Sequence, residues 1–105
     1  MSDRRVFYQD IKPYDTPASL DDLRGPAHGT ISLPVNVYWG PDPDVDLDSA
    51  AGLTQAYQAV LREGRTVDQE QILNRDRLLE IWDELLLPGR VRSLWEGKFA
   101  ELATS

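Results

Sequence analysis

Hydrophobic and polar positions follow different patterns in the two halves of the chain. From about residue 48 onward the apolar residues recur at helical spacing. One run follows the i, i+3, i+4, i+7, i+8 pattern of a single buried helix face, and its members are Leu53, Ala56, Tyr57, Val60 and Leu61. Spacing of this kind predicts three or four short helices, at about residues 49–62, 66–73, 75–86 and 89–103.

The first half lacks helical periodicity and holds six of the seven prolines, between residues 1 and 47. Polar and apolar residues alternate over about 30–33, which predicts a half-buried strand. The branched and aromatic residues of 35–39 predict a second strand, or the continuation of one kinked edge strand across Pro34. The expected fold is therefore mostly α, of the α+β class, with an irregular N-terminal half.

Polar residues that favour helix starts precede the predicted helices. Ser19 is placed to cap a short helical turn within residues 16–23, and Thr66 with Gln69 suggests a capping box. The remaining candidate N-caps are Asp48 or Ser49 for the helix at 49–62, and Asn74 for the helix at 75–86. Trp82 and Trp95 fall on apolar stripes, so both are expected in the core.

The chain has 105 residues, a length that predicts one domain over 1–105. Residues 1–15 are expected to form a flexible or docking arm. There is no cysteine and only one histidine, which excludes disulfide frameworks, thiolate zinc sites and multi-histidine metal sites. We recognise neither a signal peptide nor an apolar run of about 20 residues. A cytoplasmic location away from membranes is the expectation.

The net charge of the chain indicates which classes of partner it can bind. Eleven Lys and Arg residues stand against 18 Asp and Glu, which gives a formal charge of −7. Acidic residues are shared between both halves, so no acidic tail or basic pole stands out. Phosphate contacts need clustered cations, so the balance argues against a general nucleic-acid binder. An acidic surface instead favours a basic protein partner.

The densest acidic segment places a carboxylate at every second position from Asp42 to Asp48. An EF-hand loop begins in this way but needs Gly at position six and Glu at position twelve. Leu47 and Leu53 occupy those positions. A solvated acidic loop is the preferred interpretation, and a partner-binding patch or a metal site are the alternatives. No residue is assigned to a metal or a cofactor.

Trp39 lies directly before this acidic segment. A tryptophan that caps the core is the preferred interpretation, and an interface anchor is the alternative. The candidate partner-binding residues are Trp39, Asp42, Asp44 and Asp46. His28 could serve as a general base, with Ser32 four residues on, but no serine lies in a Gly-x-Ser-x-Gly elbow. A turn residue with local hydrogen bonds is preferred for His28, and no catalytic residue is assigned.

The last two predicted helices meet at residues 87–89 and could form a helix-turn-helix. Its recognition helix would carry Arg90, Arg92, Ser93 and Lys98 as nucleic-acid contacts. Acidic residues interleave with these cations, which weakens phosphate binding. Ordinary helix surface with ion pairs such as Arg92–Glu96 is therefore preferred.

Several segments together resemble a group of small actinobacterial proteins of similar length. They are residues 22–26 with His28-Gly29, Leu33-Pro34 with Trp39, residues 46–48, and residues 87–96 with Phe99. Some members are labelled transcriptional regulators, and similar small genes lie beside toxin-type nucleotidyltransferases. The resemblance covers most of the chain from residue 20 on. It implies a partner-binding or antitoxin-like role and carries no active-site residue.

The sequence is compatible with three functions. The first is a non-enzymatic acidic protein-interaction module, antitoxin-like or regulating a basic partner. The second is a dimeric DNA-binding regulator that uses the last two helices. The third is a small metal-dependent enzyme. Oligomeric state stays open, and a dimer is compatible with an apolar N-terminal arm that could swap between copies.

Overall fold

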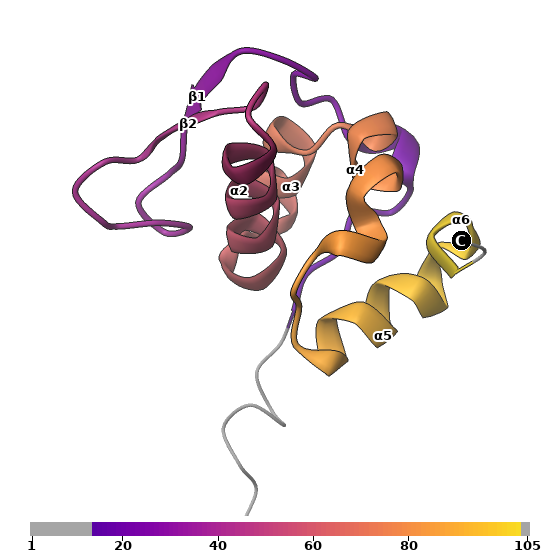
Figure 1. Ribbon diagram of the computed structural model, residues 1–105. Coiled ribbons are helices and arrows are strands. Elements are labelled where there is room, and N and C mark those ends of the chain that lie inside the picture. The colour runs from indigo at the N-terminus through magenta and orange to yellow at the C-terminus, as the bar shows by residue number, and fades with distance from the viewer. Residues whose placement is uncertain (1–13, 104–105) are drawn as a thin grey trace, which may run out of the picture.

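The computed structural model describes residues 14–103, so the expected arm over residues 1–15 lies outside the described residues except for Tyr14 and Asp15. The fold is mostly α with a two-stranded sheet, as predicted (Figure 1). The first half contains a 3-10 turn and two strands: η1 (Leu20–Asp22), β1 (Thr30–Ser32) and β2 (Asp44–Asp46). The second half contains α2 (Ala50–Glu63), α3 (Thr66–Ile72), α4 (Arg75–Ile81), η2 (Trp82–Glu84), α5 (Gly89–Lys98) and α6 (Ala100–Ala103).

The predicted helices at 49–62 and 66–73 agree with α2 and α3 to within a residue at each end. The other two predicted helices are each divided, which corrects the single helices expected over 75–86 and 89–103. After α4, the chain tightens into η2 at Trp82. After α5, Phe99 adopts an extended backbone, and its ring packs with its centroid 5.3 Å from that of Trp95. Burial of Phe99 accompanies this break before α6.

The helix starts follow local rules that can be read from the sequence. Ser49 Oγ accepts a hydrogen bond from the Gly52 N–H, and Asn74 Oδ1 accepts one from the Arg77 N–H. Ser19 caps η1 in the same way. Satisfying these otherwise unpaired N–H groups stabilises each first turn.

The capping box expected from Thr66 and Gln69 is wrong by one residue. The N-cap of α3 is Arg65, whose backbone N–H donates to Asp68 Oδ2 at 2.9 Å. Gln69 is fully buried, and its Nε2 donates to the Asp15 carbonyl at 2.8 Å. Burial of the Gln69 side chain explains why it does not reach back to the helix start.

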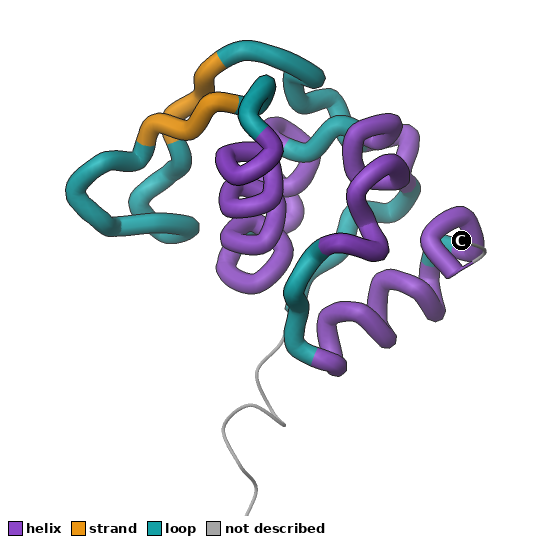
Figure 2. The backbone as a smooth tube through the Cα atoms, viewed as in Figure 1, coloured by secondary structure: helices purple, strands orange, loops and turns teal. Residues whose placement is uncertain are grey.

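β1 and β2, drawn in orange in Figure 2, form an antiparallel pair. In this pair Ile31 lies opposite Val45. The strand predicted over 30–33 is confirmed, but the one predicted over 35–39 is wrong. Val37 and Tyr38 both donate their N–H groups to the Pro34 carbonyl at 2.9 Å. These bonds close a turn, which removes the N–H groups that a ladder would need.

The helices enclose one hydrophobic cluster, and both tryptophans expected in the core lie within it. Trp82 is 1% exposed, Trp95 is 0% exposed, and their ring centroids are 6.3 Å apart. The buried Tyr57 hydroxyl accepts the Asn74 N–H at 2.8 Å, and burial raises the pKa of Tyr57. Within residues 14–103, no helix has both the length and the apolar character needed to span a bilayer.

Candidate functional site

We call residues 30–46 the β1–β2 arm, which comprises β1, β2 and the loop between them. This loop extends to one side of the helices (Figure 1). Two features hold its base. Leu33, Val37 and Val45 are buried in the common core. Asn36 Nδ2 donates to Asp68 Oδ2 at 2.8 Å, which ties the loop to α3. The arm is therefore a folded projection with a fixed base.

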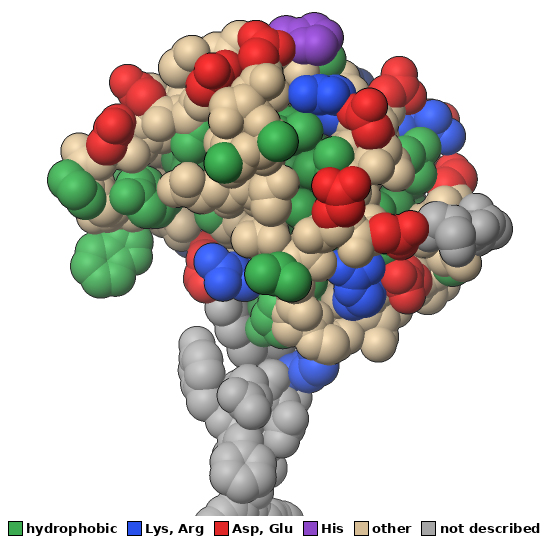
Figure 3. Space-filling model, in the orientation of Figure 1, with side chains coloured by type: hydrophobic (Ala, Val, Ile, Leu, Met, Phe, Trp, Pro, Cys, Tyr) green, Lys and Arg blue, Asp and Glu red, His purple; other side chains and the backbone are tan. Residues whose placement is uncertain are grey.

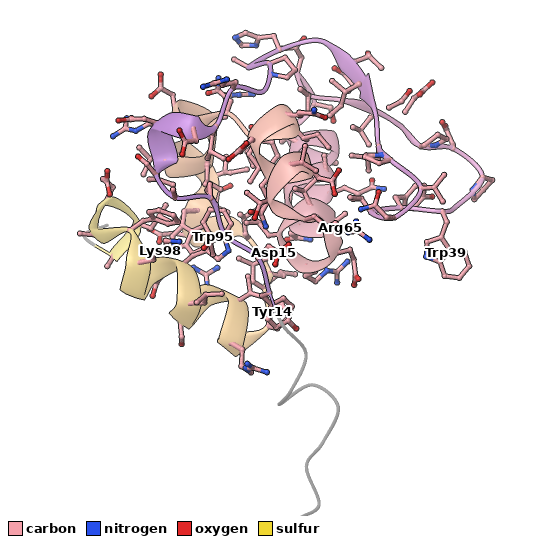
Figure 4. All side chains as sticks on the ribbon, turned by 180° about the vertical axis from the view of Figure 1, so that it is seen from behind. Tyr14, Asp15, Trp39, Arg65, Trp95 and Lys98 are labelled. Atoms are coloured by element: carbon pink, nitrogen blue, oxygen red, sulfur yellow. The ribbon has the colours of Figure 1, made fainter. Side chains whose placement is uncertain are left out.

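Trp39 lies on the outside of this arm. Its side chain is 85% exposed, and Figure 4 shows it pointing away from the helices. The interpretation of Trp39 as a core cap is therefore wrong, because Val37 takes the buried position of the loop. Val35 is also exposed, at 77%. Large side chains exposed in this way are typical of contact surfaces when they gather in one place.

An open groove runs beside Trp39. Its volume is about 600 Å³. The lining residues come from the loop and from the end of α2, and they are Val37, Tyr38, Trp39, Gly40, Arg62 and Glu63. We call the helices α2 to α6 the helical body. The β1–β2 arm therefore offers both a protruding aromatic ring and a shallow depression between its loop and the helical body.

Acidic side chains follow Trp39 along the arm. Asp42, Asp44 and Asp46 are all exposed, and Figure 3 shows red side chains along this side of the molecule. No lysine or arginine occurs between residues 25 and 61, whereas four aspartates do. This stretch contributes −4 of the formal −7. The side chains of the arm itself therefore carry a net negative charge, and Arg62 and Glu63 add one charge of each sign at the adjoining groove.

The two-residue spacing of the aspartates is the period of a strand. Val45 and Leu47 alternate with them and are buried. The acidic segment therefore contains a strand, β2, with one buried face. The interpretation of residues 42–48 as a solvated loop throughout is wrong. Asp42 Oδ1 accepts the Asp44 N–H at 3.2 Å, and Ser32 Oγ donates to Asp44. Within residues 14–103, no group of three or more His, Asp or Glu side chains is arranged to hold a metal ion.

His28 is paired with Asp48. Its Nδ1 lies 2.7 Å from Asp48 Oδ1, and the Gly29 N–H donates to Asp48 Oδ2 at 3.2 Å. The hydrogen bond with His28, followed by that from Gly29, lowers the pKa of the Asp48 carboxyl. Ser32 instead bonds to Asp44. His28 and Ser32 therefore have separate partners, and the structure does not join them in a nucleophile–base pair. The partner of His28 lies twenty residues away, which corrects the expectation of a local turn contact.

Arg92 faces the helical body. Its Nη2 donates to the Trp82 and Leu85 carbonyls, and its guanidinium carbon lies 4.9 Å from the centroid of the Trp82 ring. Its Nη1 lies 3.6 Å from Glu96 Oε2, so the Arg92–Glu96 pair expected from the sequence is present. Arg92 thus closes the turn between η2 and α5, a structural role that engages its guanidinium.

The other residues of the proposed recognition helix lie near the N-terminal segment. Lys98 Nζ donates to Thr16 Oγ1 at 2.8 Å, and the Arg90 guanidinium lies 5.8 Å from the centroid of the Tyr14 ring. Ser93 lines a shallow hollow together with Tyr14 and Arg90. These contacts hold the start of the described chain against α5 (Figure 4). They lie apart from Trp39, so the two groups of candidate residues form separate surfaces.

No protein-family model matches the chain, and no curated protein or solved structure was found that is similar to it. The resemblance to small actinobacterial proteins stays a prediction.

Proposed function

We propose that the protein is a non-enzymatic interaction module that binds a basic protein partner through the β1–β2 arm. One observation carries the proposal: Trp39 is 85% exposed at the outside of a loop whose base is fixed in the core. Tryptophan is among the residues that most often dominate the energy of protein interfaces. An antitoxin-like inhibitor is one form that such a module can take.

The charge of the arm supports a basic partner. Trp39 supplies an apolar anchor, and the exposed aspartates Asp42, Asp44 and Asp46 stand beside it. Carboxylates at the rim of an interface steer an oppositely charged partner and raise its association rate. Binding should therefore weaken as salt screens the charges, while the contact of Trp39 persists.

DNA binding by the last two helices receives less support. Arg92 is engaged with backbone carbonyls and Glu96, and Lys98 is engaged with Thr16. Phosphate contacts at these positions would require those interactions to be exchanged. A metal-dependent enzyme also receives less support, because within residues 14–103 no three His, Asp or Glu side chains are arranged to hold a metal ion.

Photo-cross-linking in the native host tests the proposal. Trp39 is replaced by a photoreactive phenylalanine analogue, and the cross-linked protein is identified by mass spectrometry. The matched control carries the same analogue at Val67, an exposed aliphatic position on α3. We expect one basic protein that cross-links through position 39 and not through position 67.

Purified partner then allows calorimetry on arm variants. A variant with Asp42, Asp44 and Asp46 changed to Asn should bind less tightly at low salt, and the difference should shrink at high salt. Equal cross-linking from positions 39 and 67, or a captured protein that binds this variant as it binds the wild type, would count against the proposal.

A further inference from the structure

The two outer edges of the small sheet differ in how their backbone groups are satisfied. The pairs 29–47 and 33–43 are joined by hydrogen bonds, from the Leu47 N–H to Gly29 and from the Leu33 N–H to Pro43. Hydrogen-bonded and non-bonded pairs alternate in an antiparallel ladder. Residues 30 and 32 of β1, and 44 and 46 of β2, therefore point their backbone groups outward.

The outer edge of β2 is closed by its own chain. Asp42 Oδ1 accepts the outward N–H of Asp44, and the Ser49 N–H donates to the outward carbonyl of Asp46 at 3.1 Å. A Cβ atom at Gly52 would overlap this Asp46 carbonyl, so the start of α2 lies directly against the edge. Another strand has no room to pair there.

The outer edge of β1 is open. Thr30 and Ser32 are exposed, and within residues 14–103 their outward N–H and C=O groups make no backbone hydrogen bond. Gly29, at φ +95°, begins this edge, and Pro34, which lacks an N–H, ends it. Two donors and two acceptors are thus presented in strand geometry, the arrangement that extended peptides use when they add to a sheet.

The two faces of the sheet specify what such a strand would carry. Thr30, Ser32, Asp44 and Asp46 share the exposed face, because Ile31 and Val45 share the inner one. A strand added at β1 would alternate its side chains between these faces. Basic residues on one face would lie within reach of the aspartates, and apolar residues on the other would extend the surface of Ile31.

We infer that the open edge of β1 binds an extended segment with alternating basic and apolar residues by β-strand addition. This inference rests on the proposed function and specifies how the partner is recognised. A second copy of this chain is a poorer occupant, since each copy carries −7 and the acidic faces would repel one another.

A synthetic probe tests the inference on the full-length protein. The ¹⁵N-labelled chain is titrated with a peptide that alternates Lys and Val, and with a peptide of the same composition that has its Lys and Val in separate blocks. We expect the alternating peptide to shift the Thr30 and Ser32 amides most and to slow their solvent exchange. Shifts of equal size with both peptides, or unchanged amides at Thr30 and Ser32, would overturn the inference.

Ser32→Pro and Ser32→Ala form a matched pair. Both lose the side-chain bond to Asp44, but only proline removes the outward N–H, and the pairing N–H of Ile31 is kept. We expect Ser32→Pro to weaken binding of the alternating peptide about tenfold relative to Ser32→Ala. Amide spectra outside residues 28–48 should match and so report an intact fold. Equal affinity of the two variants would overturn the inference.

The same variants separate this inference from the proposed function. If the cross-linked partner loses affinity with Trp39→Ala but binds Ser32→Pro and Ser32→Ala alike, the proposed function stands and strand addition is refuted. If Trp39→Ala and the triple Asp→Asn variant both bind as the wild type does, the proposed function itself is refuted. A dimer seen by sedimentation that Ser32→Pro dissociates would replace the basic partner with a second copy.

Discussion

The tryptophans of the helical body and the tryptophan of the β1–β2 arm have opposite environments. Trp82 and Trp95 are 1% and 0% exposed and pack against each other, whereas Trp39 is 85% exposed. Burial of such a side chain is among the largest favourable contributions that a residue makes to folding. Because Trp39 is exposed, it contributes little to the folding of the isolated chain. Its apolar surface is therefore accessible to another molecule.

Charge follows the same division. The helical body mixes acids with arginines that form pairs, such as Arg77 with Glu80 at 2.7 Å and Arg92 with Glu96. In the arm the aspartates have no lysine or arginine in their own stretch of sequence. Balanced charges suit a surface that faces only water, and an unbalanced field beside an exposed aromatic suits recognition. The helical body is thus the part that stabilises the fold, and the β1–β2 arm is the part that we expect to bind a partner.

The largest difference should appear between tryptophan variants. Trp95→Ala should lower the free energy of unfolding by about 3–5 kcal/mol, because it leaves a cavity beside Trp82 and Phe99. Trp39→Ala should change it by no more than about 0.5 kcal/mol. Urea denaturation measures both. Similar losses for the two variants would remove the distinction between body and arm.

A second difference lies within the acidic segment itself. Leu47 is fully buried, so Leu47→Ala should cost about 2–5 kcal/mol of unfolding free energy. The neighbouring Asp46→Asn keeps its size and an acceptor for the Asp48 N–H, and should stay within about 0.5 kcal/mol. Denaturation curves of this pair test whether the segment is a strand with one buried face. A mild Leu47→Ala would argue for a solvated loop instead.

Arg92 tests the boundary between stability and binding. Arg92→Ala removes hydrogen bonds to two carbonyls and the contact with Trp82, so it should destabilise the fold by about 1–3 kcal/mol. Arg92→Lys keeps the charge but lacks the planar fork, so it should recover only part of this loss. If either variant is as stable as the wild type but loses affinity for DNA, that result would support the helix-turn-helix alternative.

The smallest effect should come from the His28–Asp48 pair at the root of the arm. The pKa of Asp48 is lowered in the folded chain, so its stabilisation is complete above the ordinary carboxyl value of 3.8 and is lost as pH falls through the lowered value. His28→Ala removes the main cause, so the pKa of Asp48 should rise. A carbon-detected NMR titration of the Asp48 carboxyl checks this, and an unchanged pKa would contradict the pairing.

Local signals in the sequence predicted the helical body well. The caps at Ser19, Ser49 and Asn74 and the apolar stripes of Trp82 and Trp95 depend on neighbours two to four residues away, which a sequence displays directly. The sequence does not display the breaks near residues 82 and 99, because the burial of Trp82 and Phe99 in the common core depends on residues far away in the sequence.

The β1–β2 arm is harder to predict from the sequence, because strand pairing is not local. The β-prone residues 35–39 turn at Pro34, and the partner of β1 is an aspartate-rich segment with poor strand propensity. Trp39 is exposed because Val37 takes the buried position of the loop, and this choice depends on core residues far away in the sequence. The sequence does display the alternation of Asp44, Val45, Asp46 and Leu47, which has the period of a half-buried strand.

The most direct test of the central claim is the affinity of Trp39→Ala for the partner captured through position 39, measured by calorimetry beside the wild type. We predict that the dissociation constant rises at least about tenfold while the free energy of unfolding stays unchanged, as expected of an interface anchor that the fold does not need. An affinity equal to that of the wild type would contradict the assignment of the β1–β2 arm as the binding surface.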